Sequence, residues 1–303
     1  MPKVSVIVPN YNHAAYLTQR LESVLNQSFQ DFELIILDDC SSDNSKDIID
    51  QYARHPRVSH IVYNEQNSGS TFNQWEKGIR LAQGEWIWIA ESDDWSEPDF
   101  LQELVFHISA EPGVNLAFSQ LYLVDEHSQR ISAGFDGESV AQLVEGTSFV
   151  KINMLPFTGI WNASQAIFRK SSYYKLSPEY LNYKFCGDWI FWSEIGLQGQ
   201  VMISAKFHTY FRKHGLDVTS KATQSGLRFK EELKTLLFLD KLLGGYVRQQ
   251  HYIAFHFSNF YSVRGILPTA MYREIFALYA DQISFKERIK KQIRAKLGAL
   301  WKK

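Results

Sequence analysis

Acidic and amide side chains follow each of four short apolar segments within residues 1–94. The polar runs are Pro9-Asn10-Tyr11-Asn12, Asp38 to Asp43, Asn64 to Gly69, and Glu91-Ser92-Asp93-Asp94. Oxygen ligands of this kind bind Mg²⁺ or Mn²⁺, and the cation in turn bridges phosphate oxygens that a carboxylate alone would repel. A single run of this type is a common turn, whereas four in succession indicate a site for a metal-bound phosphate ligand.

The glycine-rich motifs by which many enzymes hold nucleotides are absent from the sequence. There is no Gly-x-Gly-x-x-Gly after the first apolar segment, no Gly-Lys pair for a P-loop, no Gly-x-Ser-x-Gly elbow and no His-Glu-x-x-His motif. The two cysteines, Cys40 and Cys186, are too few for a disulfide framework. A net charge of −1 argues against a nucleic-acid-binding protein.

Strands and helices must bring the polar runs together. β-branched and aromatic runs at 4–8, 32–37, 61–63 and 86–89 predict strands, and leucine and valine recur at helical spacing between the first two. The strand segments are continuously apolar, so we expect a mostly parallel, Rossmann-like sheet with helices on both faces. Ligands bind such sheets outside the carboxyl ends of the strands, where the four polar runs lie.

The chain divides by pattern into three regions, 1–110, 111–220 and 221–303. The second region mixes strand-like segments and loops, with a helix beginning at Asp188. The third is an appended C-terminal helical region, interrupted at Gly244-Gly245.

The last segment, Lys286 to Lys303, carries eight basic residues and one acid. Its apolar residues recur at helical spacing, so a basic and an apolar face separate. Such a helix lies on an anionic membrane surface or docks on its own domain, and both alternatives stay open. With no segment long enough to span a bilayer and no apparent signal peptide, we expect a cytoplasmic protein, free or peripheral on the inner face of the membrane.

The sequence resembles the family 2 glycosyltransferases, which are inverting enzymes of the GT-A fold that use nucleotide-diphosphate sugars. The resemblance is carried over residues 1–110 by Val6 to Asn12, Leu37 to Asp43, Asn67-Ser68-Gly69, and Gly84 to Ile87 leading to Glu91-Ser92-Asp93-Asp94. Between 150 and 215 it rests on Gly187-Asp188-Trp189 and Phe211-Arg212-Lys213-His214. It implies that 1–110 binds the nucleotide-sugar and that 111–220 forms the acceptor-binding half of the same domain.

The resemblance also implies which residues bind the donor. Asp39 would accept a hydrogen bond from a uracil or thymine imide, Tyr11 would stack near the base, Glu91 would lie toward the ribose, and Asp93 would hold Mn²⁺ or Mg²⁺. His214 would complete the metal shell or touch the diphosphate. The full nucleotide-binding set is Pro9, Tyr11, Asp39, Asn67, Gly69, Glu91, Ser92 and Asp93. The chain departs from the family at Glu91, where Asp is usual, and at Asn73-Gln74-Trp75, where many relatives carry an arginine.

Asp188 is the candidate catalytic base by the same resemblance, because the acceptor hydroxyl must lose its proton as it attacks the anomeric carbon. A helix N-cap is the structural alternative for this residue. The chain has Gly187 where the family often has Glu. Trp161, Trp189 and Trp192 are expected near the acceptor, where indoles pack on sugar rings, with core packing as the alternative.

We therefore expect a metal-assisted glycosyltransferase that acts in polysaccharide biosynthesis. It would transfer a sugar from a UDP-sugar to a saccharide or lipid-linked saccharide. The alternatives are a glycoside hydrolase that uses Asp93 and Asp188, and a catalytically impaired sugar- or nucleotide-binding protein. A hydrolase would release free sugar without nucleotide or metal.

Overall fold

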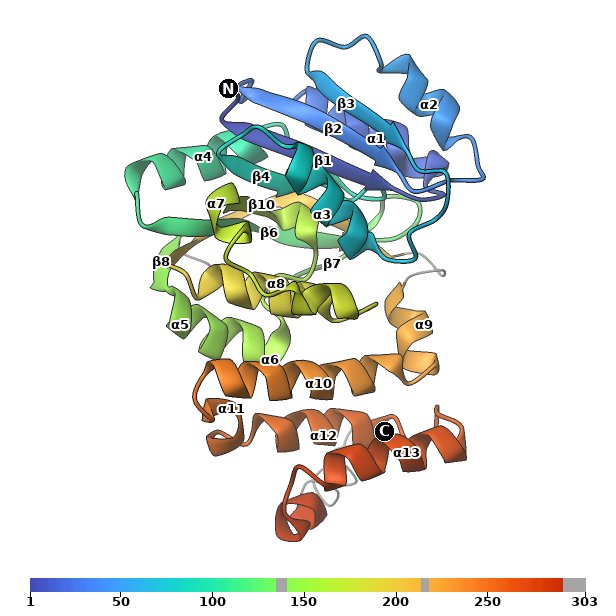
Figure 1. Ribbon diagram of the computed structural model, residues 1–303, viewed down its shortest axis with the longest axis vertical. Helices are drawn as coiled ribbons and strands as arrows, with labels where there is room; N and C mark the ends of the chain where they lie inside the picture. The colour runs from blue at the N-terminus through green and yellow to red at the C-terminus, as the bar shows by residue number, and fades with distance from the viewer. Residues whose placement is uncertain (135–140, 214–217, 291–303) are drawn as a thin grey trace.

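The computed structural model describes residues 1–134, 141–213 and 218–290, and within them ten strands form one sheet (Figure 1). The strands are β1 (Val4–Asn10), β2 (Phe32–Asp38), β3 (Val58–Tyr63), β4 (Trp86–Ile89), β5 (Trp95–Ser96), β6 (Val114–Val124), β7 (Arg130–Ala133), β8 (Gln142–Glu145), β9 (Ala166–Arg169) and β10 (Gln200–Arg212). The four strands predicted in the first region are confirmed.

Helices connect and cover these strands. They are α1 (Ala14–Leu25), α2 (Ser45–Gln51), α3 (Thr71–Leu81), α4 (Phe100–Ala110), α5 (Gly146–Phe149), α6 (Leu155–Phe157), α7 (Lys170–Tyr173), α8 (Gly187–Gly196), α9 (Val218–Gln224), α10 (Leu227–Leu242), α11 (Tyr246–Gln249), α12 (Tyr252–Ser262) and α13 (Thr269–Ala280). Three single turns accompany them, the π-helical η1 (Val150–Met154) and the 3₁₀ turns η2 (Ala163–Gln165) and η3 (Pro178–Asn182).

The strand order along the sheet is β3-β2-β1-β4-β9-β6-β10-β5. β1 to β4 are parallel, as expected, whereas β9 runs antiparallel to both of its neighbours, β4 and β6. β10 is parallel to β6. The carboxyl ends of β6 and β10 therefore lie at the same edge as those of β1 to β4.

The two faces of the sheet bury separate apolar clusters because side chains alternate along each strand. In β4, Ile87 and Ile89 face one cluster, whereas Trp86 and Trp88 face the other. Helices α1 and α4 cover the second face, and α3 and α8 cover the first. Continuous apolar strands thus required helices on both sides.

The C-terminal helices lie beyond α8, with α10 next to it and α12 and α13 further from the sheet (Figure 1). Leu236 and Leu239 of α10 and Phe257 of α12 belong to the same buried cluster as the sheet face and α8. One apolar core therefore runs from the sheet into the helical region. None of the helices described is long and apolar enough to cross a membrane.

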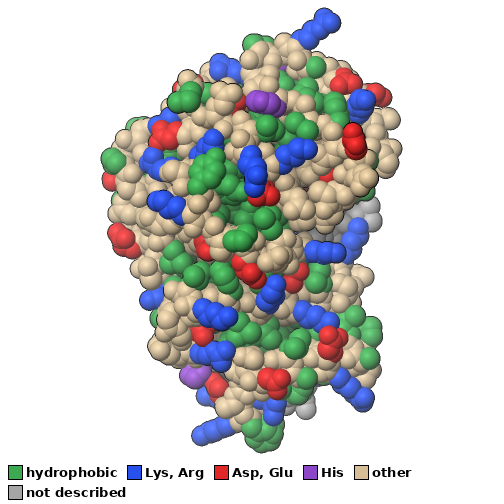
Figure 2. Space-filling model, viewed as in Figure 1, with side chains coloured by type: hydrophobic (Ala, Val, Ile, Leu, Met, Phe, Trp, Pro, Cys, Tyr) green, Lys and Arg blue, Asp and Glu red, His purple; other side chains and the backbone are tan. Residues whose placement is uncertain are grey.

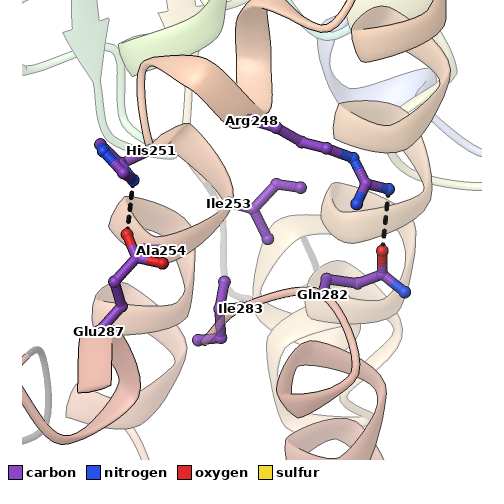
Figure 3. A pocket seen from close by; sticks show the side chains of 7 residues that line it. All are labelled: Arg248, His251, Ile253, Ala254, Gln282, Ile283 and Glu287. Carbon is purple, nitrogen blue, oxygen red and sulfur yellow. Dashed lines mark hydrogen bonds and ion pairs between the residues drawn. The ribbon is translucent and has the colours of Figure 1, made fainter. Parts of the chain in front are cut away.

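A hollow of about 200 Å³ lies among the C-terminal helices (Figure 3). Arg248 donates to Gln282 at 3.0 Å on one side of it, and His251 pairs with Glu287 on the other. These contacts fasten the segment that follows α13 to α11 and α12.

The surface seen in Figure 2 intersperses basic and acidic side chains with apolar ones. This agrees with a net charge of −1. The described part of this face therefore presents no broad field of one sign.

Candidate active site

The carboxyl ends of β2, β1 and β4 lie side by side because these strands pair in register. Asn10 pairs with Asp38 at the end of one ladder, and β4 pairs with β1 on the other side. Backbone bonds continue the alignment past the strands, since Asp39 N–H donates to Asn10 O at 2.9 Å and Asn64 N–H to Asp38 O at 2.8 Å. Parallel pairing therefore brings the polar runs to one edge.

Asp39 is buried, and donors from this chain surround its carboxylate. Oδ1 accepts from Asn64 Nδ2 at 2.6 Å and from Gln74 Nε2 at 2.9 Å, and Oδ2 accepts from Ser68 Oγ at 2.8 Å. The Ser68 backbone N–H donates to both oxygens, at 2.9 and 3.1 Å. Because a carboxylate has about four acceptor positions, a ligand N–H must displace one of these donors to reach Asp39.

Asn67 and Gly69 shape the loop that carries Ser68. Asn67 Nδ2 donates to Asp39 O at 3.1 Å, and Asn67 Oδ1 accepts from Gly69 N–H at 2.8 Å. Gly69 has a φ of +73°, a conformation that favours glycine. Asn67 thus joins the loop after β3 to Asp39, and Gly69 allows the turn that follows Ser68.

Tyr11 follows β1 and leaves 47% of its surface exposed. Pro9 lies inside the buried strand. Between them, Asn10 Nδ2 donates to Asp38 Oδ1 at 2.8 Å, which fastens the end of β1 to β2. The Tyr11 ring is therefore accessible at the edge, whereas Pro9 contributes to the strand that supports it.

Glu91 connects the end of β4 to α3. Its Oε1 accepts from Trp75 Nε1 at 2.8 Å, and Trp75 is buried. Burial and the Asp93 carboxylate raise the pKa of Glu91 to about 8, while the Trp75 hydrogen bond acts against this increase. Glu91, whose side chain is longer than the aspartate usual in the family, thus accepts a hydrogen bond from Trp75. Trp75 lies in the 73–75 segment, where many relatives carry an arginine.

Two buried arginines that the sequence analysis did not assign to the site support the loop after β4. Arg20 donates to Glu91 O at 2.8 Å and lies 3.9 Å from Asp94. Arg212 donates from Nε to Asp93 O at 2.8 Å, and its backbone N–H donates to Asp94 Oδ1 at 3.0 Å. Burial lowers the pKa of Arg20 to about 10 and raises the pKa of Asp94 to about 7. Asp94 is therefore a buried structural carboxylate between these arginines.

The helical spacing of α1 indicates that the Arg20 side chain is buried. Its position falls on the buried face with Leu17, Leu21 and Val24. A charged residue on an apolar face indicates a buried partner. Arg212 lies in the 211–214 segment that carries the family resemblance, but its partners in the 91–95 loop are distant in the sequence and no local pattern indicates them.

Arg212 is also held between aromatic rings. Its guanidinium lies 4.4 Å from the ring centre of Tyr16 and 4.9 Å from that of Trp95. Planar stacking and several hydrogen bonds suit arginine better than lysine. The loop that carries Asp93 is therefore rigidly supported from β10.

The loop after β4 can supply oxygen ligands to a cation. Ser92 is buried beneath it, 2.8 Å from His13 Nδ1, whereas Asp93 is partly exposed. Among the residues described, no group of three or more His, Cys, Asp or Glu side chains is arranged around a metal position. His214 lies outside the described residues. Burial and the Asp93 carboxylate raise the pKa of both Glu91 and Asp94, and a cation bound at Asp93 would relieve the repulsion between these carboxylates.

Asp188 lies in the first turn of α8. Its Oδ1 accepts from Trp189 N–H at 2.8 Å. Burial raises the pKa of Asp188 to about 7, backbone hydrogen bonds oppose this, and the Glu231 carboxylate adds to it. The carboxyl group therefore changes protonation near neutral pH, as a general base requires.

Gly187 lets the start of α8 approach the start of α3. A Cβ at this position would lie 2.6 Å from Phe72 Cε2 and 2.5 Å from Tyr180 O. Phe72 is in the first turn of α3, directly after the loop that binds Asp39. The close contact excludes a side chain at Gly187 and brings the start of α8, which carries Asp188, next to the first turn of α3.

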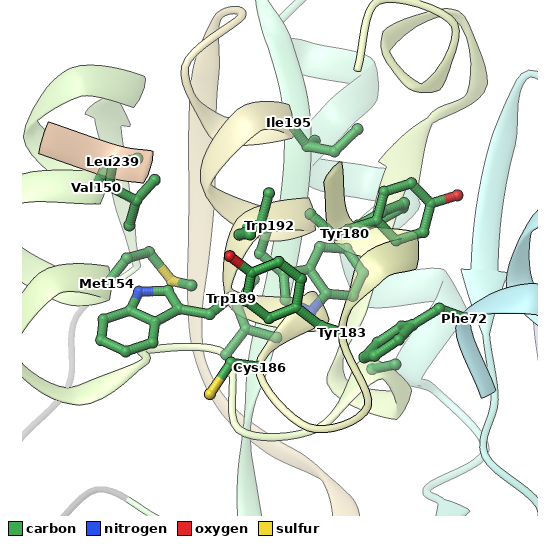
Figure 4. Packing of buried hydrophobic residues seen from close by; sticks show 14 of the residues in the cluster. Phe72, Val150, Met154, Tyr180, Tyr183, Cys186, Trp189, Trp192, Ile195 and Leu239 are labelled. Carbon is green, nitrogen blue, oxygen red and sulfur yellow. The ribbon is translucent and has the colours of Figure 1, made fainter. Parts of the chain in front are cut away.

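The expectation that Trp189 and Trp192 face an acceptor needs correction. Their exposed fractions are 2% and 0%, and both belong to the buried cluster with Met154 and Tyr183 (Figure 4). Their indoles fill the core between α8, the sheet and the C-terminal helices, so they offer no face to a sugar. Trp161 is 41% exposed.

Comparison with known proteins agrees with this architecture. TuaG of Bacillus subtilis, named for teichuronic acid biosynthesis, is 41% identical over 106 residues, or 35% of this chain and 42% of that protein. Chondroitin synthase of Escherichia coli is 32% identical over 137 residues, or 45% of this chain and 20% of the synthase. The chain thus spans less than half the length of these relatives.

Among solved structures, S. aureus TarS superposes with a TM-score of 0.67 at 19% identity, covering 94% of this chain and 50% of TarS. At this identity the match shows the fold, which is of the GT-A type. The family model described as glycosyl transferase family 2 matches residues 5–157, about half of the 303 residues. The resemblance in the sequence is confirmed, and the chain belongs to glycosyl transferase family 2.

Proposed function

We propose that this chain is an inverting glycosyltransferase. It transfers a sugar from a UDP-sugar to a hydroxyl of a saccharide or lipid-linked saccharide, with Asp188 as the general base. The observation that carries the proposal is the carboxyl of Asp188, whose pKa of about 7 suits proton abstraction. It lies at the start of a helix whose Gly187 packs against Phe72, in the first turn of α3 directly after the Asp39 loop.

Donor recognition is assigned to the edge formed by β1, β2 and β4. The uracil imide N–H takes the place of the Ser68 hydroxyl on Asp39, and the exposed Tyr11 ring covers the base. Asn67 and Gly69 hold the loop, and Glu91 and Ser92 border the ribose side. A uridine donor is supported by S. aureus TarS, which has been solved with UDP and with UDP-GlcNAc.

Asp93 is assigned to a divalent cation, Mn²⁺ or Mg²⁺, with His214 as a second candidate ligand. When bound, this cation neutralises charge on the departing diphosphate. Arg212 bonds to the Asp93 carbonyl and Arg20 to the Glu91 carbonyl, so the two arginines hold the backbone of this loop in place.

The chemical step is a single displacement. Asp188 takes the proton of the acceptor hydroxyl as its oxygen bonds to the anomeric carbon, and the bond from that carbon to the diphosphate oxygen breaks. Attack opposite the leaving group inverts the anomeric centre. A positioned carboxylate contributes about 10²- to 10⁴-fold to such a step. Trp161, with its exposed ring, remains the proposed acceptor contact.

The C-terminal segment 286–303 is proposed to bring the enzyme to lipid-linked acceptors at the inner face of a membrane. Of this segment the structure describes 286–290, where Ile289 is 40% exposed. Deleting 286–303 should abolish binding to phosphatidylglycerol vesicles. Unchanged vesicle binding would contradict this part of the proposal.

Calorimetric titration tests the donor assignment. UDP, GDP and dTDP are titrated into the protein with and without Mn²⁺, alongside Asp39→Ala and Asp93→Ala. We expect Mn²⁺-dependent binding of UDP that Asp39→Ala weakens and Asp93→Ala uncouples from the metal. Failure of every nucleotide to bind would contradict the proposed donor site.

A further inference from the structure

Glu231 of α10 binds three consecutive backbone amides at the entrance to α8. Its Oε1 accepts from Lys184 N–H at 3.0 Å, and its Oε2 accepts from Phe185 N–H at 2.8 Å and Cys186 N–H at 2.9 Å. The Glu231 side chain is 8% exposed. A buried carboxylate with three amide donors forms a strong, charge-assisted anchor. Asp188 follows two residues after the last of these amides.

We propose that Glu231 is a positioning residue for the catalytic base, so that the C-terminal helical region forms part of the catalytic machinery. The inference rests on the proposed role of Asp188. The anchored residues end at Cys186, the N-cap of α8, and α8 begins at Gly187. Asp188 lies in the first turn of α8. The position of its carboxylate therefore depends on how residues 184–186, which precede this helix, are held.

A second contact from the same region holds the other side of this turn. His256 of α12 lies against Trp189, with ring centres 5.4 Å apart, and its Nε2 is 3.0 Å from Leu155 O. Glu232, next to Glu231, pairs with Arg228 at 2.6 Å. Helices α10 and α12 thus contact residues that come shortly before and directly after Asp188 in the chain.

The charge of Glu231 also acts on Asp188. Two titratable groups interact with the base at this turn, Glu231 from α10 and Cys186 from its own helix entrance. The Glu231 carboxylate disfavours ionisation of Asp188, so removing its charge lowers the pKa of the base. This effect depends only on the charge, so the positioning role is measured by kcat in a variant that keeps the charge, Glu231→Asp.

The test compares Glu231→Gln, Glu231→Asp, Asp188→Asn and a matched control, Glu274→Gln. Glu274 is exposed and pairs with Lys230 of α10, away from α8. The readouts are UDP release from UDP-GlcNAc or the UDP-sugar that is turned over fastest, its pH profile, UDP affinity, and hydrogen exchange at residues 184–186.

We expect Glu231→Gln to lower kcat by about tenfold or more, because small misplacements of a reacting group are costly. The donor KM should stay within about twofold, because the Asp39 loop is unchanged. The acidic limb of the kcat profile should move to lower pH, and the 184–186 amides should exchange faster. Glu231→Asp, which keeps the charge but shortens the side chain, should lower kcat without moving the limb.

The outcomes separate this inference from the proposed function. If Asp188→Asn is inactive while both Glu231 variants keep the kcat of the parent, Asp188 remains the base and Glu231 has no positioning role, whether or not the limb moves in Glu231→Gln. Full activity of Asp188→Asn would show that Asp188 is not the base, and the positioning role of Glu231 would fall with it. Hydrogen exchange at 184–186 would then still show whether Glu231 anchors these amides. If Glu231→Gln does not fold, as judged by lost UDP binding, Glu231→Asp decides, and an unchanged kcat in it overturns the inference.

Discussion

Trp75 Nε1 donates a 2.8 Å hydrogen bond to Glu91 Oε1. The same indole lies against α8, with ring centres 5.4 Å from Phe191 and 6.0 Å from Trp192. One aromatic side chain of α3 therefore contacts both the end of β4, which carries the acidic loop, and the helix that carries Asp188. The donor side and the acceptor side of the proposed site meet at this residue.

Replacing Trp75 with Phe should destabilise the protein. The substitution leaves the Glu91 carboxyl, which is partly buried, without its indole donor, a loss of about 1–3 kcal/mol in the free energy of unfolding. Urea denaturation measures it. Trp161→Phe is the matched control, because Trp161 is 41% exposed and its loss should cost less than about 0.5 kcal/mol. Equal stability of the two variants would show that the indole hydrogen bond has no structural importance.

Ser68→Ala should leave UDP affinity within about threefold of the parent, whereas Asp39→Asn should weaken it by about tenfold or more. If the imide N–H takes the place of the Ser68 hydroxyl on Asp39, that hydroxyl is dispensable once UDP is bound. In Asp39→Asn, one carboxylate oxygen becomes an NH2 group. This group cannot accept hydrogen bonds from the donors that surround Asp39. Calorimetric titration of UDP compares the two, and a large loss of affinity in Ser68→Ala would place the base elsewhere.

The activity of the enzyme should rise with pH through about 7, because Asp188 accepts a proton only when ionised. The kcat profile for UDP release measures this limb. A profile that stays flat between pH 5 and 9, a range of about four units around the expected midpoint, would argue against a base of this pKa.

Stability should show the opposite trend at the same residue. The folded-state pKa of Asp188 is raised above its ordinary value, so ionisation is disfavoured in the folded protein. Asp188 therefore contributes a loss of stability that grows as pH rises from the unfolded pKa to about 7. Asp188→Asn should be more stable relative to the parent at pH 8 than at pH 4. Melting temperatures at the two pH values check the sign.

Arg212→Lys should lower the free energy of unfolding by about 2 kcal/mol and weaken Mn²⁺-dependent UDP binding. Lysine keeps the charge but cannot reach the carbonyls of Asp93, Asp125 and Glu126 together, as the guanidinium does. Arg130→Lys, at an arginine that lies over Tyr122, is the control. Equal effects of both substitutions would mean that the hydrogen bonds of Arg212 add nothing specific.

Local patterns in the sequence predicted the first half of the fold. Each strand there is a continuous apolar run, and the polar residues at its end must share an edge once the strands are parallel. The sequence therefore predicts the edge of the sheet at which Asp39, Asn67, Gly69 and Glu91 lie. The periodicity of the strands and their order along the chain determine this edge.

Contacts between distant segments were decided only by the tertiary structure. The bonds of Arg212 to the Asp93 loop and of Glu231 to the entrance of α8 join residues that are 119 and about 45 positions apart. Likewise, only the structure shows that Trp161 is partly exposed whereas Trp189 and Trp192 are buried. The sequence does not distinguish the three tryptophans. Strand periodicity and turn chemistry are local properties, whereas the partners of a buried charge or indole depend on how complete elements pack.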